Sequence, residues 1–179
     1  MVRSTNTAAE EMRKQPDVEY IIVLGAHVDG TRLTLALLER TRRALQYLED
    51  HPGILYPQVA EVLQQLSWKY KLFIVSNCQK GYIEVLMRSC NLEEYITDIE
   101  CYGNTGLSKA DNISMVIQRN HLDQSFYVGD TAMDAEAAAD AGIPFVHAAY
   151  GFGQVNGAEA VIREFGELLQ LSRKLLGED

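Results

Sequence analysis

Short apolar runs alternate with amphipathic stretches along most of this chain, and that alternation constrains the fold more than any other feature. Runs typical of buried strands lie at residues 20–26, 71–77, 125–130 and 144–150, with a shorter one from residue 98. Apolar residues at helical spacing lie between and after them, at about residues 37–48, 57–66, 81–90, 110–120, 133–141 and 158–176, the last range including a strand fragment. Because strands that alternate with helices pair in parallel through right-handed crossovers, the pattern predicts an α/β fold with a parallel sheet.

The length of the chain predicts one domain. With 179 residues, of which 47% are hydrophobic, it is long enough to bury a core of its own. Residues 1–18 are polar and of mixed charge, so we expect them to form an N-terminal arm ahead of a single domain over residues 19–179. We find no signal peptide and no apolar run long enough to cross a bilayer.

The charge and the cysteines limit the partners and the compartment. The net charge of -9 at pH 7 disfavours nucleic acid and anionic membranes as partners, because phosphate backbones are bound by clustered lysine and arginine. The three cysteines, Cys78, Cys90 and Cys101, show no metal-binding spacing. Free thiols are typical of a reducing compartment, so we expect a cytoplasmic protein.

Polar side chains follow the predicted strands, at the edge where an open parallel sheet binds its ligands. These candidates are His27, Asp29, Thr31, Ser76, Asn77, Lys109, Asp130 and Asp134. Carboxylates are typical ligands of Mg²⁺, whereas a lysine ammonium and a serine hydroxyl suit phosphate oxygens. The set therefore predicts phosphoryl transfer assisted by a metal ion.

Three of these segments resemble motifs of one family. VSN with Ser76, GLSKADN with Lys109 and VGDTAMDAEAAADAGIP with Asp130 and Asp134 are similar to the second, third and fourth motifs of the haloacid dehalogenase superfamily. The resemblance runs from about residue 54 to the C-terminus and is to the phosphoglycolate phosphatase-like branch. It implies a Rossmann-like three-layer sandwich. It also implies little or no cap domain, because only residues 32–56 separate Thr31 from the predicted helix at residue 57.

The same resemblance implies a role for each candidate. Asp130 would bind Mg²⁺, and Asp134 would support the metal shell through water. Ser76, with the neighbouring Asn77, would bind the transferring phosphoryl group, and Lys109 would neutralise the charge around it. The implied protein is a Mg²⁺-dependent phosphohydrolase that acts on a small-molecule phosphate monoester.

The first motif departs from the family pattern, which is Asp-x-Asp-Gly-Thr with a nucleophile followed by a general acid and base. The chain has His27-Val28-Asp29-Gly30-Thr31 at this place. This segment can be aligned with the family motif in two registers. In the first register, which we prefer, Asp29 is the acid and base, and His27 replaces the nucleophile. An imidazole is a poor ligand for Mg²⁺, so attack and metal binding would both weaken. In the second register Asp29 is the nucleophile, with Thr31 where P-type ATPases carry threonine.

Two further interpretations of the N-terminal half stay open. Asp29-Gly30-Thr31 also fits a turn in which Gly30 adopts a positive φ and Thr31 caps a helix. Residues 20–52 are similar to the first strand and helix of the SanA-like envelope family, which would place a gene-fusion junction near residues 50–54. The alternative function is then a catalytically impaired relative, with His27 at the nucleophile position, that acts as a binding or regulatory module.

Other residues near the predicted sheet edge receive simpler interpretations. His147 is predicted to be a sheet residue near the site, and Cys78 a packed thiol. Tyr150, Gly151 and Gly153 form a glycine-containing loop after the strand at residues 144–150, which is a candidate for the edge of a substrate site.

Overall fold

The computed structural model describes residues 35–50 and 54–177, with side chains from residue 42 onward. Several predictions fall on other parts of the chain. The N-terminal arm at residues 1–18, the strand at residues 20–26, the first-motif residues His27, Asp29 and Thr31, and most of the junction near residues 50–54 lie outside the described residues.

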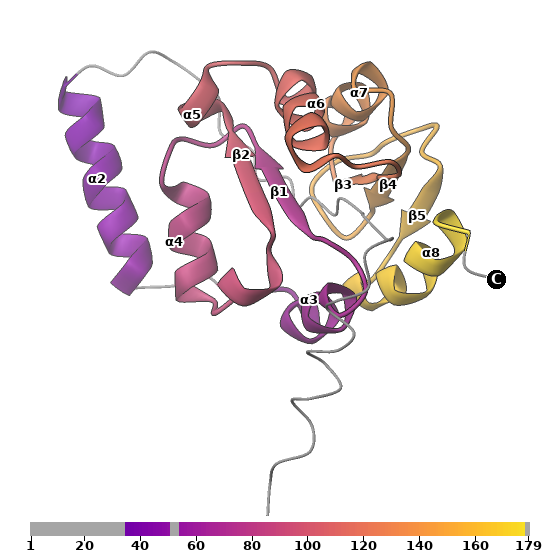
Figure 1. Cartoon of the computed structure of the whole chain (residues 1–179). Coiled ribbons are helices and arrows are strands. Elements are labelled where there is room, and N and C mark those ends of the chain that lie inside the picture. The colour runs from indigo at the N-terminus through magenta and orange to yellow at the C-terminus, as the bar shows by residue number, and fades with distance from the viewer. Residues whose placement is uncertain (1–34, 51–53, 178–179) are drawn as a thin grey trace, which may run out of the picture.

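The described strands form two parallel sheets (Figure 1). The first pairs β1 (Phe73–Ser76) with β2 (Asp98–Cys101), and the second has the order β3-β4-β5, with bounds Tyr127–Gly129, Phe145–Ala148 and Ala160–Ile162. Ser76 lies opposite Cys101 in the first sheet, and Gly129 lies opposite His147 in the second. The parallel pairing confirms the predicted α/β class.

Each predicted helix is present, and one short helix was not foreseen. The helices are α2 (Leu35–Asp50), α3 (Val59–Ser67), α4 (Tyr82–Ser89), α5 (Tyr102–Thr105), α6 (Lys109–Asn120), α7 (Ala132–Asp140) and α8 (Leu168–Leu175), with 3-10 turns at Glu93–Tyr95 and Phe165–Glu167. Pro57 does not open α3 as expected, because Gln58 adopts a left-handed φ of 66° and the helix begins after it. α5 is a single turn that ends at Gly106, with a φ of 69°.

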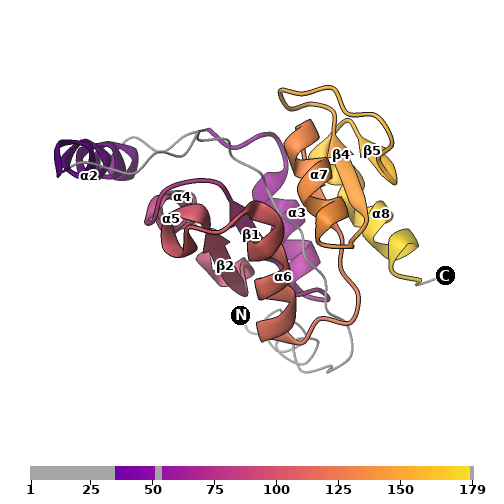
Figure 2. The same cartoon turned by 90° about the horizontal axis from the view of Figure 1, so that it is seen from above.

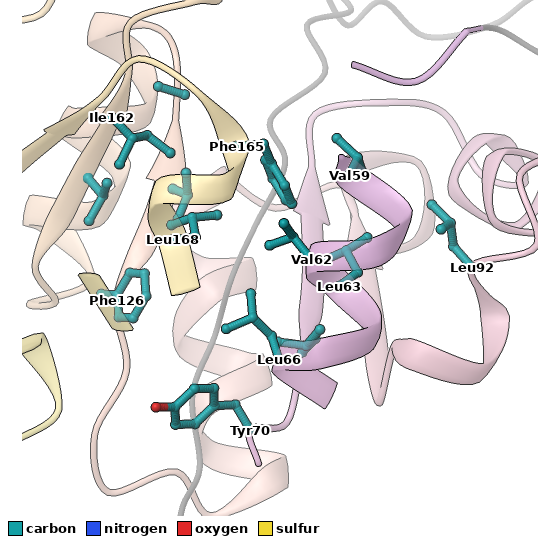
Figure 3. Close-up of a cluster of buried hydrophobic side chains, with 14 residues drawn as sticks. Val59, Val62, Leu63, Leu66, Tyr70, Leu92, Phe126, Ile162, Phe165 and Leu168 are labelled. Atoms are coloured by element: carbon teal, nitrogen blue, oxygen red, sulfur yellow. The ribbon is translucent and has the colours of Figure 1, made fainter. Parts of the chain in front are cut away.

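Helices cover both faces of the strands, which makes the three layers. Alternate residues of a strand face opposite sides. On one side Phe73, Val75 and Tyr127 pack against α6 and α7. On the other side Val128 and Val146 pack against α3, α8 and the turn that carries Phe165 (Figure 3). This arrangement confirms the Rossmann-like sandwich.

The segment ahead of α3 holds a helix where a cap domain would be inserted. Within residues 35–50 and 54–58, α2 is the one regular element. It lies beside α4 at the edge of the molecule (Figure 2), and Arg88 of α4 binds Glu49 of α2 with an Nη2–Oε1 distance of 2.6 Å. The described residues thus agree with the predicted lack of a sizeable cap. No helix among them is long and apolar enough to span a bilayer.

Candidate active site

The turn between β3 and α7 is built by a reciprocal capping box. Thr131 is the N-cap of α7, and its Oγ1 accepts a hydrogen bond from the Asp134 amide at 3.2 Å. The Asp134 carboxylate in turn accepts from the Thr131 amide at 3.1 Å, from the Thr131 hydroxyl at 2.7 Å and from the Asp130 amide at 3.2 Å. Because these donors converge on one oxygen, Asp134 fixes the backbone that carries Asp130.

A buried ion pair joins this turn to α6. Lys109 Nζ lies 2.5 Å from Asp134 Oδ1, and the two side chains are only 8% and 2% exposed. Burial would raise the pKa of the Asp134 carboxyl, but the charge of Lys109 and the hydrogen bonds from Lys109 and Thr131 outweigh it and hold the pKa below its ordinary value. Asp134 is therefore an anion at neutral pH.

Both ends of α6 are fixed, which determines where Lys109 lies. At the N-terminus, Ser108 caps the helix by accepting a hydrogen bond from the Asp111 amide at 3.1 Å. Near the C-terminus, Arg119 binds Asp98 at 2.7 Å and Glu100 at 2.6 Å. Burial would raise the pKa of both carboxyls, but the hydrogen bonds from Arg119 outweigh it and hold both below their ordinary range. This network attaches α6 to β2.

Tyr127 connects the ion pair to the second motif. Its hydroxyl donates a hydrogen bond to the Val75 carbonyl at 3.1 Å, one residue before Ser76. Its ring lies 5.8 Å from Lys109 Nζ, a distance at which cation and ring attract each other. Burial, and then the charges of Asp134 and Asp130, raise the pKa of Tyr127 well above its ordinary value, so the hydroxyl keeps its proton. Tyr127 is not among the residues predicted from the sequence.

The second-motif residues end β1. Ser76 is buried, and its Oγ accepts a hydrogen bond from the Cys78 amide at 3.3 Å. Asn77 is half-buried, and within the described part of the chain the hydrogen bonds of the Lys109–Asp134 group do not extend to it. Thus Lys109, Asp130 and Asp134 form one connected group, and Ser76 is linked to it through Val75 and Tyr127. His27 and Asp29 lie outside the described residues.

Cys78 is packed in a small apolar cluster with Ile74, Ile83 and Cys101, in agreement with its interpretation as a packed thiol. A hydrogen bond with Cys101, opposed by burial, lowers the pKa of Cys78 to about 7. The same hydrogen bond, together with burial, raises the pKa of Cys101. Cys78 is therefore the thiol of this pair that ionises first.

The glycine loop after β4 packs directly on Asp130. The Phe152 amide donates a hydrogen bond to Asp130 Oδ2 at 2.9 Å. His147 Nε2 lies 3.2 Å from the Gly153 carbonyl, and because a carbonyl only accepts, the proton of this contact is on Nε2. A Cβ added to Gly151 would overlap the Asp130 side chain, so this close approach needs glycine.

The carboxylates of Asp130 and Asp134 suit a divalent cation in different ways. Mg²⁺ is commonly held by one or two carboxylates and several waters. Asp130 is half-buried at the end of β3, and one backbone amide binds its Oδ2, so it fits a direct ligand. Both oxygens of Asp134 already accept hydrogen bonds, which fits a supporting role. Among the described residues no group of three or more histidine, cysteine, aspartate or glutamate side chains could hold a metal ion.

Comparison with known proteins identifies the family. The model of the haloacid dehalogenase-like hydrolases matches residues 4–148, so the chain belongs to this family. The match begins well before residue 54 and includes the first-motif segment with His27 and Asp29. The similarity of residues 20–52 to the SanA-like family stays a prediction. No curated protein matches the chain.

Solved structures of low sequence identity share the fold. A haloacid dehalogenase-like hydrolase from Streptococcus pneumoniae is 17% identical, with a TM-score of 0.66, covering 85% of this chain and 97% of its own. A predicted phosphoglycolate phosphatase from Haemophilus somnus is 22% identical, with a TM-score of 0.64 and coverages of 79% and 69%. A magnesium-bound hydrolase of the haloacid dehalogenase (HAD) type from Bacillus subtilis is 14% identical, with a TM-score of 0.65. The match covers 86% of this chain and 98% of the Bacillus subtilis chain.

Proposed function

We propose that this protein is a Mg²⁺-dependent phosphohydrolase that acts on small-molecule phosphate monoesters. The observation that carries the proposal is the buried pair of Lys109 and Asp134, joined by hydrogen bonds to the turn that holds Asp130. Family membership supports a hydrolase. The relatives that are described as a phosphoglycolate phosphatase and as magnesium-bound support the choice of phosphate ester and of cation.

The charges of the described residues support this chemistry. The Asp130 carboxylate would hold Mg²⁺, which when bound neutralises charge on the phosphoryl oxygens. Lys109 would place a second positive charge beside them, while Asp134 holds the lysine side chain and the Asp130 backbone in place. The Ser76 hydroxyl, at the end of β1, and Asn77 would bind the phosphoryl oxygens. Fixed charges of this kind need no reorganisation during the reaction.

The residues of the first motif decide whether the protein is an active phosphohydrolase or a catalytically impaired relative. Asp29 would act as the acid and base or, in the second register, as the nucleophile, and it is a candidate metal residue together with Asp130 and Asp134. The specific observation that favours the alternative, a catalytically impaired binding or regulatory module, is His27 at the nucleophile position. We place either form of the protein in the cytoplasm, because Cys78, Cys90 and Cys101 are free thiols.

Hydrolysis of p-nitrophenyl phosphate with and without Mg²⁺ tests the proposal. We expect turnover that requires Mg²⁺, and a loss of at least about a thousandfold in Asp29→Asn, since that change removes the acid and base or the nucleophile. Asp140→Asn, an exposed aspartate of α7, is the matched control and should keep full activity. An inactive native protein that gains turnover in His27→Asp would instead establish the impaired alternative.

A further inference from the structure

A cavity of about 190 Å³ lies beside Asp130. Residues 54–56, Val59, the ends of β3 and β4, the loop after β4 and Phe165 line it, and most of its lining surface is apolar. Among the described residues that line the cavity, Asp130 alone carries a charge. The roles proposed above for Asp130 and Lys109 leave this space unused.

The floor of the cavity is part of the rigid core. Val59, Ala148 and Phe165 line it, and they are 4%, 6% and 3% exposed. All three belong to the cluster between α3, α8 and the second sheet, where Phe165 lies between the two helices (Figure 3). A floor of packed core side chains keeps its shape, so the cavity is formed before a ligand arrives.

The wall and mouth of the cavity are aromatic. The rings of Tyr56 and Tyr150 meet edge to face, with centroids 5.2 Å apart and an interplanar angle of 61°. Tyr56 is 50% exposed, and the neighbouring Ile54 and Phe152 are almost fully exposed. Burial, and then the charges of Tyr56 and Asp130, raise the pKa of Tyr150 to about 12, so it stays neutral. Apolar side chains gathered around a cavity mouth are typical of a ligand site.

We infer that this cavity binds the leaving group of the substrate, and that this group is apolar and close in size to one aromatic ring. The inference rests on the proposed function, which puts the phosphoryl group at Asp130. An apolar cavity of about 150 Å³ holds benzene, so the volume here admits a single ring. A sugar or a charged group would lose its hydration in the cavity without gaining hydrogen-bond partners.

The reaction assigned to such a substrate is ordinary hydrolysis. The bond between phosphorus and the ester oxygen breaks, and water supplies the oxygen that the phosphate gains. The protons of that water end on the phosphate and on the released alcohol or phenol, so no other reactant is needed. Only the cavity, and not the Lys109–Asp134 group, distinguishes one ester from another.

Tyr56→Ala removes the more exposed of the two tyrosine rings that form the cavity wall, and it tests the inference. We expect kcat/KM for phenyl phosphate to fall about tenfold, while kcat/KM for glycerol 1-phosphate stays unchanged, because only the phenyl ring contacts the wall. Tyr47→Ala, an exposed tyrosine of α2 that does not line the cavity, is the matched control and should alter neither substrate. Equal effects on the two substrates, or none, would overturn the inference and leave the hydrolase itself standing.

Calorimetry with phosphonates, which are not hydrolysed, separates the cavity from the chemistry. With Mg²⁺ present, benzylphosphonate should bind at least about tenfold more tightly than methylphosphonate, and Tyr56→Ala should remove the difference. If this preference appears in a protein that hydrolyses nothing, the apolar site stands and the proposed hydrolysis is wrong. If both phosphonates bind equally, or neither binds, the cavity is not a ligand site.

Discussion

Lys109→Met will unfold at a markedly lower urea concentration than the native protein and will lose at least about a hundredfold in kcat/KM. The substitution removes the cation from a pair whose side chains are 8% and 2% exposed, so it leaves the Asp134 carboxylate buried without its counter-ion. Breaking a buried pair in this way costs about 3–5 kcal/mol of unfolding free energy. Urea unfolding at pH 7 measures the first effect, and p-nitrophenyl phosphate hydrolysis the second.

The partner substitution and the pH dependence provide the controls. In the double variant Lys109→Met, Asp134→Asn the buried charge is gone, so part of the lost stability should return. Because the pKa of Asp134 is lowered in the folded state, its contribution is present above the ordinary aspartate pKa, about 4, and is lost as the pH falls through the lowered value. Lys174→Met, at an exposed lysine of α8, should leave stability unchanged. A Lys109→Met variant as stable as Lys174→Met would show that the pair stabilises nothing.

Gly151→Ala is expected to lower kcat/KM about a hundredfold, because a displacement of roughly 1 Å at a catalytic group has effects of that size. The added Cβ would overlap the Asp130 side chain, so either the carboxylate or the loop must move. The hydrogen bond from the Phe152 amide to Asp130 would be disturbed by the same shift. We expect KM for Mg²⁺ to rise, which a Mg²⁺ titration of the initial rate would measure.

Gly166→Ala is the matched control for this prediction. Its new Cβ meets Oε1 of Gln58 at 2.5 Å, which is the flexible end of a long side chain that can rotate away. Activity and Mg²⁺ dependence should therefore stay close to those of the native protein. If Gly151→Ala behaves like Gly166→Ala, the loop does not position Asp130.

Local patterns predicted the elements of the fold well. The apolar spacing of residues 110–120 and 133–141 predicted α6 and α7 to within a residue or two, because one helix face must be buried whatever lies against it. The capping box of Thr131 and Asp134 is also local, since the two residues are one helical turn apart. The predicted helix start at Pro57 was wrong, because Gln58 adopts a left-handed conformation that no sequence spacing reveals.

Features that depend on tertiary packing could not be predicted in the same way. The contact of Lys109 with Asp134 spans 25 residues of sequence. Their positions after predicted strands and the family resemblance both placed them near one site, but neither predicted the ion pair. Tyr127 could have been noticed, because a tyrosine in a buried strand needs a partner for its hydroxyl. The cavity could not be predicted, since its lining comes from residues 54–56, Val59, the ends of two strands, the loop after β4 and Phe165.

The central claim is that Asp130 holds a cation beside Lys109 so that a phosphate can bind there, and calorimetric titration of inorganic phosphate tests it most directly. The native protein should bind phosphate at least about tenfold more tightly when Mg²⁺ is present. Asp130→Asn, which keeps the shape of the side chain and removes its charge, should show no such gain. A native protein whose phosphate affinity is the same with and without Mg²⁺, or an Asp130→Asn variant that responds to Mg²⁺ like the native protein, would contradict the account.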